Sequence, residues 1–141
     1  MKYKTMKAKK VTATVEASST GFGVFSDKLP GITGYGDTIE KAKEDIKDAI
    51  KDILEMHEEQ GTKAPAYLNN GNLDFMYKYD IASIFSHFGM LDATNFARKI
   101  NLNPSLMRQY KSGLTVASDK QKKKIEEGLH QLGQELLNVH L

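Results

Sequence analysis

The 141-residue chain contains no cysteine, few prolines and no long apolar segment. Without cysteine it has neither a disulfide framework nor a thiolate metal site. No apolar run approaches the roughly 20 residues that a transmembrane helix needs. The basic start of the chain, Met1 to Lys7, leads into an alternating segment and not into the apolar block of a secretion signal. We therefore expect a cytoplasmic protein that carries no metal or other cofactor.

Net charge is also small, at +2, but the charges are distributed unevenly. Residues 1–79 carry 12 basic and 12 acidic side chains, whereas residues 92–124 carry eight basic side chains and two acidic ones. Such a local excess is the electrostatic footprint of a polyanionic partner. For the lysines between positions 120 and 124, a solvated lysine-rich helix is an equally good interpretation.

Short strands and one long helix are predicted for the first half of the chain. Apolar and polar residues alternate from Val11 to Glu16, which is typical of a half-buried strand, and residues 23–25 and 32–35 predict two more. Thr38 is suited to cap a long amphipathic helix that ends at Gly61. Alternating aromatic residues predict a fourth strand over residues 73–79.

From Ile81 onward the apolar periodicity is helical, with breaks at Asp92, residues 101–104, Gly113 and residues 118–119. Several short helices cannot bury their apolar faces separately, so they must pack as a bundle. The predicted fold is therefore α+β. Residues 1–79 form a small antiparallel sheet packed on one long helix, and residues 80–141 form an all-α domain.

Residues 92–113 resemble the helix-turn-helix of phage repressors of the XRE/Cro type. Ala97 is small where two helices cross closely, and Asn101 tolerates the left-handed backbone of the turn. Asn103 can cap the second helix, Pro104 fits its first turn and Gly113 ends it. Apolar contacts between the two helices are assigned to Phe96, Ile100, Met107 and Tyr110.

This assignment leaves polar side chains of the second helix facing outward. Arg108 and Gln109 are expected on base edges, because Arg and Gln pair bidentately with guanine and adenine, and Ser105 on a base or a phosphate. Phosphate contacts position a protein without specifying sequence, and we assign them to Asn103, Lys111, Lys120 and Lys122. The expected partner is double-stranded DNA. Because such proteins read two half-sites, a homodimer or higher oligomer is expected as well.

The first half resembles the HicB family of antitoxins over about residues 10–80. The resemblance is carried by Gly21-Phe22-Gly23, by Asp27-Lys28-Leu29-Pro30-Gly31 and by the segment from Gly36 to Ala42. It implies a partial RNase H-like fold, with a three-stranded antiparallel sheet, a helix across it and a further strand. It also implies a type II antitoxin that blocks a small HicA-type mRNA-interferase toxin and represses its own operon through the helix-turn-helix.

Two other functions remain open. The first is a standalone helix-turn-helix transcriptional regulator whose N-terminal domain only dimerises or senses a ligand. The second is an RNA-directed enzyme or RNA binder, which is the weakest, because Glu16 and Asp27 are too dispersed for two-metal chemistry. The histidines are scattered as well, at positions 57, 87, 130 and 140. We therefore expect no catalytic residue and no metal site.

Overall fold

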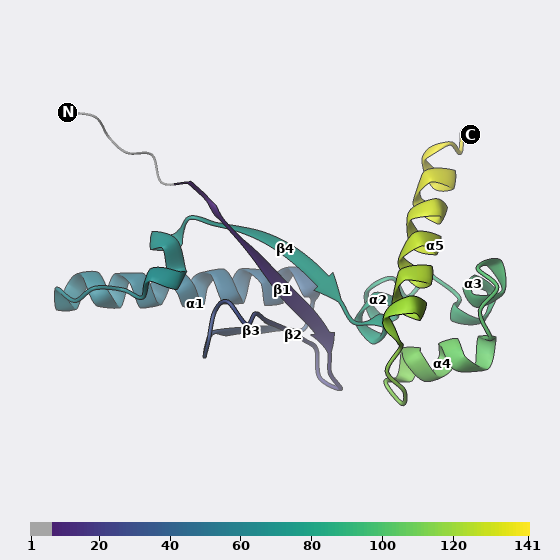
Figure 1. The fold of residues 1–141 in the computed structure, drawn as a ribbon, viewed down its shortest axis with the longest axis horizontal. Coiled ribbons are helices and arrows are strands. Elements are labelled where there is room, and N and C mark those ends of the chain that lie inside the picture. Colours follow the sequence, from purple (N-terminus) through teal and green to yellow (C-terminus); the bar gives the residue numbers. More distant parts are fainter. Residues whose placement is uncertain (1–6) are drawn as a thin grey trace. The chain divides into compact units, whose positions relative to one another are not determined.

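The computed structural model describes residues 7–141 and divides the chain into two compact units (Figure 1). Unit 1 ends at His87 and unit 2 spans Phe88–Leu141. The basic start of the chain, apart from Lys7, lies outside the described residues. Within residues 7–141, no helix combines the length and the apolar character needed to cross a membrane. An α+β chain with a helical second half is confirmed.

Unit 1 contains a four-stranded sheet formed by β1 (Lys9–Ala17), β2 (Phe22–Phe25), β3 (Thr33–Gly36) and β4 (Leu73–Tyr79), in the order β3-β2-β1-β4. The pairs β1–β2 and β2–β3 are antiparallel, but β4 pairs parallel with β1. The sheet is therefore mixed, which corrects the antiparallel sheet that we predicted for residues 1–79. The cause is the crossover: β1 and β3 run in one direction, and a helix between β3 and β4 returns the chain before β4 begins.

That crossover is α1 (Ile39–Gln60), which starts and ends where the sequence predicts. The Thr38 side chain accepts a hydrogen bond from the Lys41 backbone N–H at 3.1 Å, and Gly61 ends the helix in the left-handed conformation, with φ at 66°. The helix buries an apolar stripe against the sheet. The approach is close at Gly34, where a Cβ would lie 2.6 Å from the Ile46 backbone nitrogen. Only glycine fits there.

Between α1 and β4 the chain forms the 3₁₀ segment η1 (Ala66–Gly71). After β4 comes α2 (Ile81–His87), which the Asp80 carboxylate caps by accepting from the Ser83 N–H at 2.7 Å. Ser83 is fully buried, and its hydroxyl lies within hydrogen-bonding distance of the Asp80 and Val15 carbonyls. This packing on β1 explains why unit 1 extends through α2 to His87 instead of stopping at Tyr79.

Unit 2 is helical, with α3 (Ala93–Lys99), α4 (Pro104–Ser112) and α5 (Asp119–Leu137). The helices share one small core, and α5 approaches the end of α3 closely at Gly128, where a Cβ would collide with a methyl group of Ile100. The buried apolar residues of the unit are Ala93, Phe96, Ala97, Leu102, Met107, Tyr110, Ala117 and Ile125.

Candidate nucleic-acid interface

A tight turn joins α3 to α4. Asn101 adopts the left-handed conformation with φ at 57°, and the Leu102 N–H donates to the Ala97 carbonyl at 2.8 Å. The Asn103 carboxamide oxygen accepts from the backbone N–H groups of Ser105 and Leu106 at 2.8 and 3.3 Å. Pro104 follows in the first turn of α4. The local roles predicted for Asn101, Asn103 and Pro104 are thus confirmed, and the start of α4 is well defined.

Apolar contacts and one lysine hold the two helices at this turn. Ala97 and Met107 have no exposed surface, and Phe96 and Tyr110 are buried, as expected for the crossing of α3 and α4. From α5, the Lys124 ammonium donates to the Asn101 carbonyl at 2.7 Å, which satisfies a backbone acceptor at the end of α3. The left-handed turn is therefore braced by the apolar core and by α5.

Three of the predicted contact residues on α4 are exposed: Ser105, Arg108 and Lys111. Arg108 Nη1 donates to the hydroxyl of Thr94, in the first turn of α3, at 3.0 Å. Arg108 and Lys111 lie three residues apart and line one depression of about 440 Å³ together with residues 89–94. The structure thus places both Arg108 and Lys111 beside the start of α3. The spacing of the two residues in the sequence did not reveal that α3 lies next to them.

Gln109 is placed differently from the other predicted base-reading residue, Arg108. It is half-buried, and its carboxamide oxygen accepts from the Thr115 hydroxyl at 3.1 Å. The Leu114 N–H also donates to the Gln109 carbonyl, at 3.0 Å. Gln109 therefore supports the connection from α4 to α5, so a base contact would require the bond to Thr115 to break. The sequence offered no signal for this bond, because it depends on how the loop folds back.

The basic residues of the segment 92–124 fall into two groups. Some make contacts within unit 2: Lys99 forms an ion pair with Glu135 at 2.8 Å, and Lys124 bonds the turn. Others are exposed, including Lys120 and Lys122 in the first two turns of α5. Ser118 caps that helix by accepting from the Gln121 N–H at 3.2 Å. Lys120 and Lys122 therefore lie exposed at a well-defined helix start.

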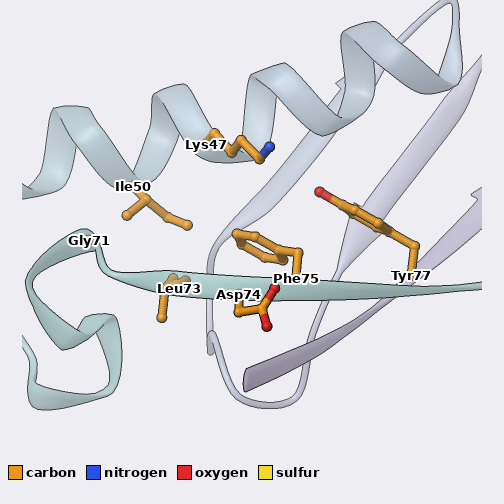
Figure 2. Close-up of a pocket in the computed structure, with 7 residues that line it drawn as sticks. All are labelled: Lys47, Ile50, Gly71, Leu73, Asp74, Phe75 and Tyr77. Atoms are coloured by element: carbon orange, nitrogen blue, oxygen red, sulfur yellow. The ribbon is translucent and has the colours of Figure 1, made fainter. Parts of the chain in front are cut away.

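Unit 1 has a recess of its own, about 500 Å³ in volume, between α1 and β4 (Figure 2). Figure 2 shows Phe75 and Tyr77 projecting from β4 below Lys47 of α1. The two rings stack with centroids 5.8 Å apart, and the Lys43 ammonium lies 4.2 Å from the centre of the Tyr77 ring. The recess is lined by Lys47, Ile50, Gly71, Leu73, Asp74, Phe75 and Tyr77.

The hydroxyl of Tyr77 is the unusual polar group of this recess. Its oxygen is shielded from solvent and has no hydrogen-bond partner within the described part of the chain. Burial, and secondarily the neighbouring Tyr79, raises the pKa of Tyr77 above its ordinary value. A shielded hydroxyl without a partner is costly, because it has given up its bonds to water. An acceptor atom from outside could reach this hydroxyl only after the side chains that shield it move aside.

The outward face of α1 carries acids at three- and four-residue spacing. All of them are exposed, and lysines such as Lys41, Lys47 and Lys51 interrupt them. Lys41 pairs with Asp37 at 3.0 Å and thereby holds the pKa of that carboxyl below its usual value. The acids of this face are Glu44, Asp48, Asp52, Glu55 and Glu59. We call them the α1 acidic face.

Within the described part of the chain, the other side chains that could take part in catalysis or metal binding do not converge on one site. Glu16 and Asp27 are exposed. His57 Nδ1 lies 2.7 Å from the Thr62 hydroxyl, beside the end of α1, and His87 Nε2 lies 3.8 Å from the Glu40 carboxylate. Among residues 7–141, no group of three or more histidine, aspartate and glutamate side chains is arranged to hold a metal ion.

No protein-family model, no curated protein and no solved structure matches this chain. Its function is therefore inferred from its residues and their geometry.

Proposed function

We propose that the chain is a sequence-specific DNA-binding regulator that reads the major groove with α4. The observation that carries the proposal is the α3–turn–α4 arrangement, with Asn101 left-handed, Asn103 capping α4 and Arg108 exposed on it. A short helix that is capped, braced at both ends and basic on its exposed side has the size and charge that the major groove admits.

The contacts of Arg108 favour it as the principal base-reading residue. Its hydrogen bond to Thr94 holds the guanidinium beside the start of α3, so less side-chain entropy is lost when it meets a base. Bidentate bonding to the O6 and N7 of guanine is the commonest specific contact of arginine. We assign Ser105, one turn earlier, to a base or a phosphate. Phosphate contacts are assigned to Asn103, Lys111, Lys120 and Lys122, and Gln109 becomes a secondary candidate.

Within this class, the function we favour is that of a HicB-like antitoxin. Unit 1 would capture a small basic ribonuclease of the HicA type, and unit 2 would repress the operon that encodes both proteins. The support is the resemblance over residues 10–80 together with the α1 acidic face, whose side chains are all exposed. Acidic side chains attract a basic partner over a distance and raise the rate of encounter more than the affinity.

DNA binding is tested by fluorescence anisotropy with labelled duplexes, one from the chain's own promoter region and one of random sequence. We expect tighter binding to the promoter, and an affinity for both duplexes that falls steeply with salt, because each neutralised phosphate releases counterions. Equal affinity for the two duplexes at physiological salt would contradict sequence-specific reading.

Toxin capture is tested by co-expressing the full chain with a small basic ribonuclease of the HicA type. The double variant Asp48→Lys, Asp52→Lys should lose growth rescue, because it reverses two charges at the middle of the α1 acidic face. Arg108→Ala is the matched control and should rescue growth as well as the unchanged chain while losing repression. Full rescue by the charge-reversed variant would remove the acidic face from toxin capture.

A second candidate function, a regulator that senses a small molecule in unit 1, is favoured by the recess under Lys47. An aromatic carboxylate would place its ring on Phe75, and its oxygen would accept from the Tyr77 hydroxyl once the side chains that shield that hydroxyl move aside. Benzoate and larger aromatic carboxylates are suitable probes. A sensor should show a rise in melting temperature with one of them that is absent in Tyr77→Phe, and a change in DNA affinity with the same compound. No shift with any of these probes would count against this candidate.

A further inference from the structure

The C-terminal half of α5 carries an apolar stripe that unit 2 leaves uncovered. Ile125 and Gly128 are buried, and Leu129 and Leu132 are half-buried, but Leu136 is 61% exposed and Leu137 is 75% exposed. Figure 1 shows this half of α5, coloured yellow, continuing past α3 and α4 within the unit. Neighbouring exposed leucines on one helix are typical of an interaction surface.

Gly133 lies beside this stripe and has no explanation within unit 2. A glycine inside a helix destabilises it relative to alanine, so its presence calls for a reason. Gly128, the other glycine of α5, has one, because a Cβ there would collide with Ile100. Apart from the adjoining backbone of α5, no atom of residues 7–141 lies within 4 Å of the position that a Cβ on Gly133 would occupy. A helix from another molecule that crosses close to position 133 would supply the missing reason.

The stripe is complementary to itself. When two copies of one helix pack antiparallel about a twofold axis, residues at equal distances on either side of the axis face each other. With the axis between Leu132 and Gly133, Leu129 of one copy meets Leu136 of the other. Leu132 of one copy then lies over Gly133 of the other, where the absent side chain leaves space for it. A large side chain is thus matched by a small one at the closest point.

We propose that a second copy of the chain covers this surface through antiparallel packing of α5 on α5, centred between Leu132 and Gly133. The pairing supplies the twofold axis that reading two half-sites would need, but it rests on the surface of unit 2 and not on DNA binding. Lys120 and Lys122 lie at the other end of α5, away from the contact. One helix face is smaller than the about 800 Å² that a partner contributes to a standard interface, so the dimer dissociates readily on dilution.

Sedimentation of the full chain without DNA tests the pairing. The unchanged chain should be dimeric at about 100 μM and increasingly monomeric on dilution, as a small interface implies. Leu136→Glu should be monomeric throughout, with an unchanged circular dichroism spectrum, because this side chain is mostly exposed in one copy. The matched control is Gln134→Glu, which adds the same charge on the opposite side of α5 and should dimerise like the unchanged chain.

Two results would overturn the proposal: an unchanged chain that stays monomeric, and a Leu136→Glu variant that still dimerises. The first would mean that no second copy covers the stripe, and the second would place the dimer contact elsewhere. Because no DNA is present, neither result bears on DNA binding, which the anisotropy experiment tests separately.

Single cysteines test the antiparallel orientation, since the chain has none of its own. Under mild oxidation Gly133→Cys should form a disulfide-linked dimer, because positions 133 of the two copies face each other near the axis. Leu136→Cys should not. In the antiparallel pair its two copies are offset by seven residues, about 10.5 Å along the helix, whereas a disulfide needs Cα atoms within about 7 Å. Cross-linking of Leu136→Cys but not of Gly133→Cys would contradict the antiparallel arrangement.

Discussion

The two units differ in how completely each buries its apolar residues. Unit 1 encloses a cluster of aliphatic side chains between α1 and the sheet, contributed by residues as distant in sequence as Val11 and Leu68. Unit 2 has a smaller core and exposes Leu114, Val116, Leu136 and Leu137. Unit 1 has therefore nearly closed its core within one chain, whereas unit 2 leaves apolar and basic side chains exposed. The predictions below test that contrast, in order of decreasing expected effect.

The largest effects on stability should come from substitutions that overfill the core of one unit and leave the core of the other unit unchanged. Gly34→Val would push a side chain into the backbone of α1 and should destabilise unit 1 by about 3 kcal/mol or more. Ala97→Leu should do the same to unit 2, because Ala97 has no exposed surface. Urea unfolding followed by two-dimensional NMR reports each unit separately. Loss of both sets of resonances together in either variant would show that the units do not fold independently.

The second prediction separates base reading from phosphate contact within unit 2. Arg108→Ala should cost roughly 1–3 kcal/mol on the cognate site and relax the preference at one base pair. Lys122→Ala should weaken binding to all sequences alike and reduce the salt dependence. Anisotropy titrations against a panel of single-base variants of the site measure both effects. Identical sequence profiles for the two variants would contradict our assignment of these residues.

The third prediction compares one helix cap in each unit. Removing the capping oxygen in Asn103→Ala or Thr38→Ala leaves backbone N–H groups without their partner and should cost about 1 kcal/mol in either case. Only Asn103→Ala should also lower DNA affinity, because it loosens the start of α4. Thermal unfolding and anisotropy on the same samples make the comparison. Reduced DNA affinity in Thr38→Ala would show that unit 1 takes part in DNA binding.

The fourth prediction concerns the two glycines of α5. At concentrations where the chain is monomeric, Gly133→Ala should stabilise unit 2 by about 0.5–1 kcal/mol, because alanine favours the helix and meets open space. Gly128→Ala should destabilise the same unit, since its methyl group collides with Ile100. Denaturant unfolding measures both. Equal effects of the two substitutions would mean that α5 does not pack on α3 as described.

The smallest effect should appear at high pH, in unit 1 alone. Burial raises the pKa of Tyr77 in the folded chain, so the folded state keeps this proton more tightly than the unfolded state. The associated stability is fully present below the ordinary pKa of about 10 and is lost as the pH rises through the raised value. Denaturant unfolding between about pH 9 and pH 12 should show this loss in the unchanged chain. Tyr77→Phe, which has no ionisable group there, should lose less.

Local structure could be predicted from the sequence. The capping roles of Thr38 and Asn103, the left-handed Asn101 and the helix ends at Gly61 and Gly113 all follow from backbone needs that a residue meets with its near neighbours. The alternation in β1 and β4 follows in the same way from the period of an extended chain. These features tie α3, the turn and α4 together, so the part of the candidate site that is local was predictable.

Only the tertiary structure decided which distant residues meet. It set the parallel pairing of β4 with β1, the burial of Ser83 against Val15 and the inclusion of α2 in unit 1. It also decided that Arg108 bonds Thr94, that Gln109 bonds Thr115 and that Lys124 bonds the turn at Asn101. The physical reason is that periodicity and capping act over a few residues, whereas these contacts depend on how whole elements pack, which no short segment specifies.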